Sequence, residues 1–170
     1  VETDVSDGMP SFDMVGFLTS EVKEARERVR TALKNAGFRL PAKKITINLT
    51  PADVRKSGTG CDLPMAASVL AAFGFLDEHI LSSYLLLGEV GLNGSILPTK
   101  GVLSAAVLAQ KEGMQGIVVP WENAREAAIL DTVKVIPVKN LKEFVQICQQ
   151  ELPETCFYRE QQDFWKTEYD

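Results

Sequence analysis

Side chains that could act as nucleophiles or bases gather around one polar loop and the apolar segment after it. The run Lys56-Ser57-Gly58-Thr59-Gly60-Cys61-Asp62 is where a nucleophile at the start of a helix would lie. A serine nucleophile also needs a base within hydrogen-bond reach of its hydroxyl. A residual Ser/Lys hydrolase would therefore use Lys100 as the base for Ser57 or Ser104, and this hypothesis stays open.

Asp62, in the same segment, has a structural interpretation. A carboxylate at the start of a helix accepts hydrogen bonds from the free backbone amides there, and Pro64 is tolerated in a first helical turn. We therefore interpret Asp62 as a structural cap rather than as a catalytic group.

Positive charge is concentrated early in a chain that is acidic overall. The net charge is −5, yet residues 20–56 hold ten Lys and Arg against four acidic residues. Helical spacing places part of this charge opposite the apolar face of one helix, and the rest flanks the next strand. The candidate DNA-binding residues are Arg26, Arg30, Lys34, Lys43, Lys44, Arg55 and Lys56. Two interpretations stay open: contact with backbone phosphates, and an ordinary solvated helix face. Aromatic residues are not interleaved with these cations, so any contact would be independent of base sequence.

Other chemistries find little support. The cysteines Cys61, Cys148 and Cys156 form no CxxC pair, and His79 is the only histidine in the sequence. The sequence therefore predicts neither a zinc site nor a disulfide framework. Neither GxxxxGK[ST] nor a GxGxxG between strand and helix occurs, so no nucleotide cradle is predicted. No apolar run reaches the roughly 18 residues of a membrane span. We expect a cytoplasmic protein with no membrane contact and no metal site.

The elements that must position these residues form an α/β fold of the α+β type, with a mixed sheet and packed helices. Residues 1–6 and 11–16 are predicted strands around a turn at residues 7–10, and we expect them to pair as an antiparallel hairpin. A helix starts at Thr19 or Ser20, whose side chain would cap it, and stops at Gly37. An alternating strand at residues 44–49 precedes a buried helix over residues 62–73.

The second half alternates strands with helices. Strands are predicted at residues 84–88, 116–119 and 133–138, and a turn with a returning strand at residues 89–97. Helices are predicted at residues 102–112, 122–130 and 141–149, the last capped by Asn140. We expect one domain over residues 1–150. Residues 151–170, with six acidic and two basic side chains, are predicted to be a linker.

Two separate motifs resemble the proteolytic domain of Lon. Gly88-Glu89-Val90-Gly91-Leu92-Asn93-Gly94-Ser95-Ile96-Leu97-Pro98 and Gly116-Ile117-Val118-Val119-Pro120-Trp121-Glu122-Asn123 both resemble Lon segments, and the likeness extends over about residues 1–148. It implies a Lon-like mixed sheet. The family's serine, however, is matched by Asp62 and its lysine by Leu103. The resemblance therefore implies a fold without the peptidase dyad.

Four longer motifs resemble the amino-terminal domain of the magnesium-chelatase-like competence proteins called ComM or YifB. They span residues 10–17, 22–33, 38–53 and 62–66, and include Phe38-Arg39-Leu40-Pro41-Ala42-Lys43-Lys44-Ile45-Thr46-Ile47-Asn48-Leu49 and Asp62-Leu63-Pro64-Met65-Ala66. The chain departs from the family pattern at Phe17-Leu18 and at Cys61, outside the proposed site.

This second resemblance implies a place in a larger machine. We expect a non-proteolytic, Lon-like domain, cut from a longer parent, that precedes an AAA+ ATPase module and acts in assembly and DNA interaction during branch migration and natural transformation. The resemblance implies no catalytic residue in these 170 residues. It implies ATP and magnesium for the absent module, and a homo-hexamer for the full-length parent.

Overall fold

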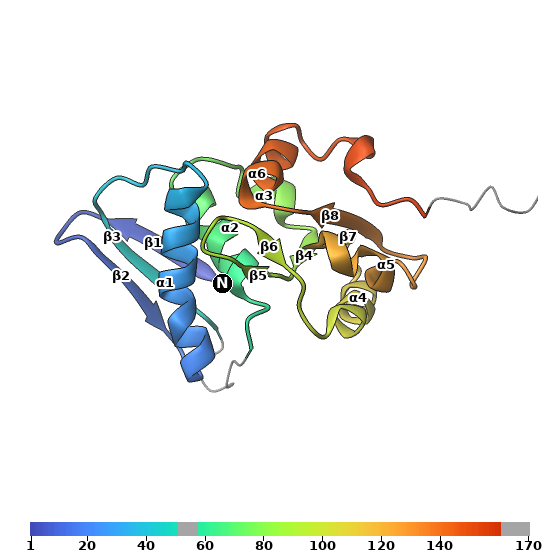
Figure 1. Cartoon of the computed structure of the whole chain (residues 1–170), viewed down its shortest axis with the longest axis horizontal. Helices are drawn as coiled ribbons and strands as arrows, with labels where there is room; N and C mark the ends of the chain where they lie inside the picture. The colour runs from blue at the N-terminus through green and yellow to red at the C-terminus, as the bar shows by residue number, and fades with distance from the viewer. Residues whose placement is uncertain (51–57, 161–170) are drawn as a thin grey trace, which may run out of the picture.

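A computed structural model describes residues 1–50 and 58–160 of the chain. The elements are arranged around two sheets and a short hairpin (Figure 1). In chain order they are β1 (Glu2–Ser6), β2 (Ser11–Val15), α1 (Ser20–Asn35), β3 (Lys44–Asn48), α2 (Asp62–Ala72), α3 (Glu78–Leu81), β4 (Tyr84–Leu86), β5 (Glu89–Val90), β6 (Ile96–Leu97), α4 (Val102–Lys111), β7 (Gly116–Pro120), η1 (Trp121–Asn123), α5 (Ala124–Ala127), β8 (Lys134–Val138), α6 (Leu141–Gln149) and η2 (Glu154–Cys156).

The amino-terminal sheet corrects the predicted hairpin. Its strand order is β1-β3-β2, so β3 lies between the two strands that were expected to pair. β3 is antiparallel to β1 and parallel to β2. The central place goes to the strand with the strongest apolar alternation, since Ile45 and Ile47 are buried whereas most of β1 and β2 is exposed or half-buried. A strand buried on one face and bonded along both edges satisfies its backbone fully.

Helix α1 covers the inner face of this sheet and confirms the predicted helix. Its buried residues recur at helical spacing: Val22, Ala25, Val29, Ala32 and Leu33. It ends where Gly37, with φ of 92°, donates its N–H to the Lys34 carbonyl at 3.1 Å, as glycine commonly does after a helix. Among the described residues, no side-chain hydrogen bond of the N-cap residue caps the start of α1 as predicted. Thr19 occupies the N-cap position without a side-chain bond to the helix, and its buried hydroxyl has no hydrogen-bond partner among the described residues.

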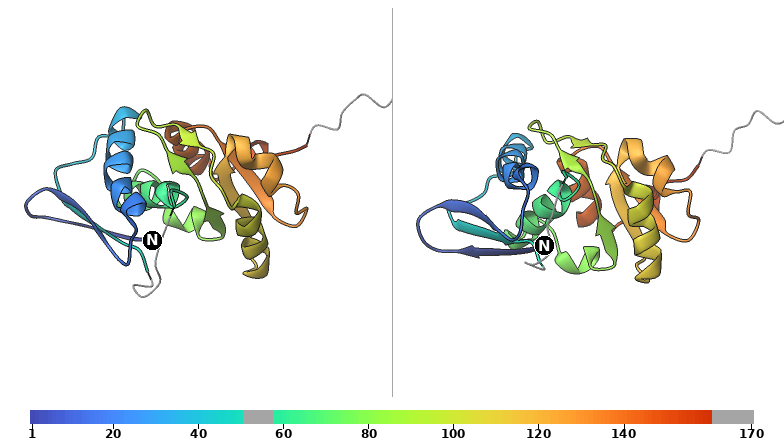
Figure 2. Two further views of the ribbon diagram at one scale, coloured as in Figure 1. Left: turned by 60° about the horizontal axis from the view of Figure 1, so that its bottom comes forward. Right: turned by 90° about the horizontal axis from the view of Figure 1, so that it is seen from below.

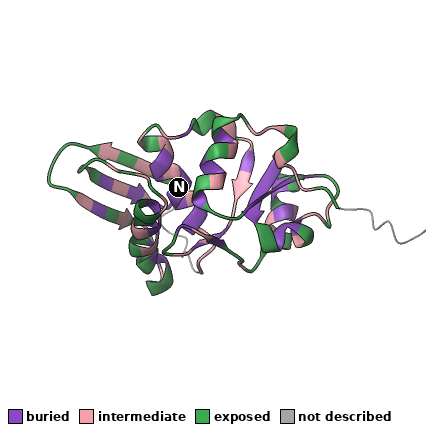
Figure 3. Cartoon of the chain, turned by 45° about the horizontal axis from the view of Figure 1, so that its top comes forward, coloured by how far each residue is buried: buried purple, intermediate pink, exposed green. Residues whose placement is uncertain are grey.

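Helix α2 lies at the centre of the fold and confirms the prediction of a buried helix. It contacts α1, β1 and β5, and apolar side chains are buried around most of its circumference, among them Leu63, Met65, Ala66, Val69 and Leu70. Figure 3 shows burial concentrated between the two sheets. One continuous hydrophobic core therefore runs from Phe12 to Cys148.

The carboxyl-terminal sheet has the order β4-β7-β8, with all strands parallel. Alternate residues of β7 and β8 serve two cores, as a period of two requires. Val118 and Ile136 belong to the large core with α2 and α6, whereas Ile117, Val119 and Val135 pack with residues of α4 and α5. The two views of Figure 2 show α4 and α5 on the side of this sheet away from α1.

Two later predictions are confirmed, and one predicted helix is shorter than expected. β5 and β6 form the expected antiparallel turn and return, and Asn140 caps α6 by accepting a hydrogen bond from the Glu143 N–H at 2.8 Å. The helix predicted at residues 122–130 is instead the 3-10 turn η1 followed by the four-residue α5. The short helix α3, which Asp77 caps, was not predicted.

Residues 151–160 return to the sheet. The Tyr158 N–H donates to the Val135 carbonyl at 2.7 Å, and the Lys134 amine lies 4.8 Å from the centre of the Phe157 ring. The domain boundary at residue 150 stays a prediction. Within the part of the chain that the structure describes, no helix is both long and apolar enough to cross a bilayer.

Candidate functional site

The basic face of α1 is exposed as its spacing predicts. Arg26, Arg30 and Lys34 are all exposed, one turn apart on the side of the helix away from its buried residues. Arg26 makes one solvent-exposed contact, 3.6 Å from its Nε to the Glu27 carboxylate. Exposed ion pairs of this kind add little stability, so the three cations are accessible to an anionic partner.

Of the remaining candidate cations, Lys43 and Lys44 lie at the start of β3 rather than on α1. Lys43 is ion-paired with Asp7 across the end of the sheet, and the hydrogen bond from Lys43 lowers the pKa of the exposed Asp7 carboxyl. Lys44 starts β3, in register with Ser6 and Ser11 of the flanking strands. Arg55 and Lys56 lie outside the described residues.

One basic residue of α1 points inward. Arg28 donates from Nε to Asp62 Oδ2 at 2.9 Å and from a terminal nitrogen to Oδ1 at 3.1 Å, a bidentate geometry that fixes both side chains. The Asp62 carboxylate is 1% exposed and the Arg28 side chain 19%. Arg28 also donates to the Glu21 carbonyl at 3.0 Å. The pair therefore joins the middle of α1 to the first residue of α2.

Asp62 accepts an amide hydrogen bond, but not one from its own helix. The N–H donor is that of Val90 in β5, 3.2 Å from Oδ2, and Cys61 occupies the N-cap position of α2. Burial raises the pKa of Asp62, while the hydrogen bonds from Arg28 and from the Val90 amide oppose that rise. The hydrogen bond to Asp62 raises the pKa of Arg28. The carboxylate thus holds three elements together.

Further hydrogen bonds tie the segment before α2 to the same elements. Thr59 donates from its hydroxyl to Glu89 at 3.1 Å, and the Gly58 N–H donates to the Glu21 carboxylate at 3.1 Å. The Gly88 N–H donates to the Gly60 carbonyl, and the Gly88 carbonyl accepts from the Leu63 N–H, each at 3.0 Å. This network places the start of α2 against α1 and β5.

The hydrolase hypothesis gains no geometric support from the described residues. Lys100 and Ser104 are exposed, and no hydrogen bond joins Lys100 to any serine in residues 1–50 and 58–160. A lysine base needs a dry pocket that favours its neutral form. The Ser68 hydroxyl bonds Thr3 at 2.6 Å, and Ser57 lies outside the described residues. Asp62 has both oxygens engaged by Arg28 and Val90 and is closed to solvent.

Sequence reasoning missed the role of Arg28, although a signal was present. Arg28 follows Ala25 by three residues and precedes Ala32 by four, so it falls within the buried stripe of α1. A charged residue in such a stripe requires a partner. The acidic residue that opens the apolar α2 segment was the natural candidate.

These features define the class of protein: an α/β domain with a central buried helix, an internal ion pair between α1 and α2, and an exposed basic helix face. A family model described as subunit ChlI of Mg-chelatase matches residues 1–123. The YifB proteins of Escherichia coli and Salmonella typhimurium are 48% and 47% identical to the chain over 105 residues, and the competence protein ComM of Haemophilus influenzae is 45% identical over the same length. Each alignment covers 62% of this chain and 21% of the relative.

The chain therefore belongs to the magnesium-chelatase-like family that includes ComM and YifB. It spans about one fifth of the length of these relatives.

Proposed function

We propose that this chain is a non-catalytic, Lon-like domain of a longer magnesium-chelatase-like AAA+ ATPase of the cytoplasm, and that it contacts DNA through the basic face of α1. The observation that carries the proposal is the exposed series Arg26, Arg30 and Lys34 on a helix that is held firmly by its opposite face. The name of the Haemophilus influenzae relative, a competence protein, supports DNA as the polyanion, since competence is the uptake of DNA.

The chemistry of this face suits phosphates rather than bases. Three cations spaced by one turn extend over about 12 Å of helix, and each can neutralise a phosphate and release its counterion. Such contacts position a protein on nucleic acid without reading sequence. In this proposal the domain serves assembly of a hexamer and holds DNA, branch migration is the work of the whole protein, and ATP and magnesium bind a module outside these 170 residues.

The test is a comparison of charge-reversed variants. Fluorescence anisotropy with labelled duplex and single-stranded DNA at several salt concentrations would measure affinity and its salt dependence. We expect Arg26→Glu/Arg30→Glu to weaken binding to both DNAs by at least about tenfold at low salt and to flatten the slope of log K against log salt by about two.

The control carries the same charge change elsewhere. Lys100 and Lys111 are exposed and lie away from α1, so Lys100→Glu/Lys111→Glu separates a local contact from the effect of net charge. Equal affinities for the α1 variant and the wild type would remove this face from DNA binding, and equal losses in the two double variants would reduce the effect to overall charge.

A further inference from the structure

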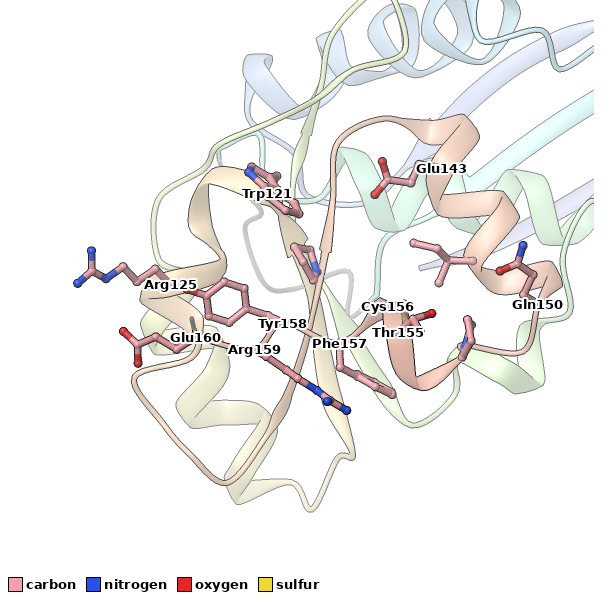
Figure 4. Close-up of a pocket in the computed structure, with 13 residues that line it drawn as sticks. Trp121, Arg125, Glu143, Gln150, Thr155, Cys156, Phe157, Tyr158, Arg159 and Glu160 are labelled. Atoms are coloured by element: carbon pink, nitrogen blue, oxygen red, sulfur yellow. The ribbon is translucent and has the colours of Figure 1, made fainter. Parts of the chain in front are cut away.

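A hollow of about 700 Å³ lies beside β8, away from α1. η1, α6 and the returning segment at residues 153–160 surround it (Figure 4). Its lining includes Trp121, Arg125, Glu143, Phe157, Tyr158 and Arg159. These residues are distant in the sequence, and only the fold brings them together.

Aromatic rings provide stacking surfaces in this hollow. Trp121 is 50% exposed, unusual for so large a ring, and the Lys139 amine lies over it, 4.3 Å from the ring centre. Phe157 and Tyr158 are half-buried, and the backbone bond from Tyr158 to Val135 holds that segment against β8. Trp121 directly follows β7, and Tyr158 is hydrogen-bonded to β8, so the sheet holds the backbone that carries both rings.

Two arginines and two glutamates belong to the lining of the hollow. Arg125 and Arg159 are exposed at the rim in Figure 4, and Lys134 and Lys139 adjoin the rings. Two carboxylates, those of Glu143 and Glu160, belong to the lining. Arginine and lysine side chains beside exposed aromatic faces are the combination that binds unpaired bases and their phosphates.

We propose that this hollow binds single-stranded nucleic acid, with a base stacked on Trp121 and the flanking phosphates held by Arg125 and Arg159. Its volume is within the range of small-molecule sites and accommodates a nucleotide. The bases of a duplex are already stacked and cannot lie on Trp121, so the site distinguishes single strands from duplex. It is separate from the basic face of α1, and it does not depend on that face contacting DNA.

Anisotropy with a labelled strand of about 20 thymidines, beside a duplex of equal length, tests the proposal. Trp121→Ala should weaken single-strand binding by at least about fivefold, the lower end expected for loss of one stacked base, and change duplex binding little. Trp121→Phe keeps an aromatic face and should retain most of the affinity. Leu108→Ala, which shortens a comparably exposed apolar side chain on α4, should bind as the wild type does.

The rim cations give a second readout. Arg125→Gln/Arg159→Gln should lower single-strand affinity and its salt dependence, and it leaves the core untouched because both side chains are exposed. Wild-type single-strand affinity in Trp121→Ala would overturn the proposal. If that variant instead loses self-association in sedimentation velocity while keeping single-strand affinity, the hollow holds a second copy and the proposal is wrong.

The two DNA-binding proposals fail separately. Loss of single-strand affinity in Trp121→Ala, together with wild-type binding in Arg26→Glu/Arg30→Glu, supports the hollow and removes the α1 face. The opposite result supports the face and removes the hollow.

Discussion

At the scale of single residues, the pair of Arg28 and Asp62 explains how a buried carboxylate is tolerated at the start of α2. A charge removed from water is costly unless it is paired and fully hydrogen-bonded. Asp62 has Arg28 on both oxygens and the Val90 amide on one of them. At the position where the Lon resemblance places a serine, the chain carries a group that links α1, α2 and β5.

Removing both partners of this pair should therefore cost less than the sum of the costs of removing each one alone. We expect Arg28→Ala to lower the free energy of unfolding by about 3 kcal/mol, because Asp62 would keep a buried charge with a single amide donor. Asp62→Ala should also destabilise, and the double variant should lose less than the sum of the two, with a coupling of more than about 1 kcal/mol. Urea denaturation of the four proteins measures the cycle.

Arg26 provides the control for this cycle. It is an exposed arginine of the same helix, and Arg26→Ala should change stability by less than about 0.5 kcal/mol. Additive losses in the Arg28 and Asp62 variants would show that the pair is not coupled.

At the scale of elements, the contact between β7 and β8 leaves almost no space at the start of β7. A Cβ built on Gly116 would lie 2.4 Å from the Lys134 carbonyl oxygen and 3.0 Å from the Tyr84 ring. The first of these is a backbone atom of the neighbouring strand, which cannot move without breaking the register of the pair. Gly116 is therefore required by the close approach of β7 to β8 and β4.

Gly116→Ala should accordingly displace β8 or β4. We expect a loss of about 2–3 kcal/mol, typical of overpacking in a rigid interior, seen as a lower midpoint in differential scanning calorimetry. Gly113→Ala is the comparison, because Gly113 has φ of 67° and open space around its Cα, so that the cost is only about 1 kcal/mol of backbone strain. A loss at Gly116 no larger than that at Gly113 would contradict the steric argument.

At the scale of the whole molecule, a single core connects the two sheets. Ile47 of the first sheet, Leu63 of α2, and Val118 and Ile136 of the second sheet belong to one cluster of buried residues. Because residues of both sheets and of α2 share this cluster, the loss of either sheet would expose part of the common core.

The chain should therefore unfold in one cooperative transition. Far-UV circular dichroism reports both sheets, and the fluorescence of Trp121, measured in a Trp165→Phe background, reports the second, so the two urea curves should superimpose. Leu63→Ala, which empties part of the shared core, should lower both midpoints together by an amount equivalent to about 2–5 kcal/mol. Separate midpoints for the two probes would show that the sheets are independent units.

Local pattern determined much of this protein. The periodic apolar residues of α1 and α2, the buried run of β7 and the cap at Asn140 were readable because each depends on neighbours within a few residues. The exposed face with Arg26, Arg30 and Lys34 followed from the same periodicity. These features belong to single elements, so the sequence alone was enough to predict them.

Tertiary structure decided what depends on distant partners. The order β1-β3-β2 arises because β3 has the most apolar surface to bury, a comparison between strands rather than a property of one. Arg28 meets Asp62 across 34 positions of chain, and Trp121 and Tyr158 share a hollow through the packing of β8 and the return of residues 151–160. Hydrophobic burial is non-directional, so the sequence determined which faces had to be covered, and only the folded packing decided what covers them.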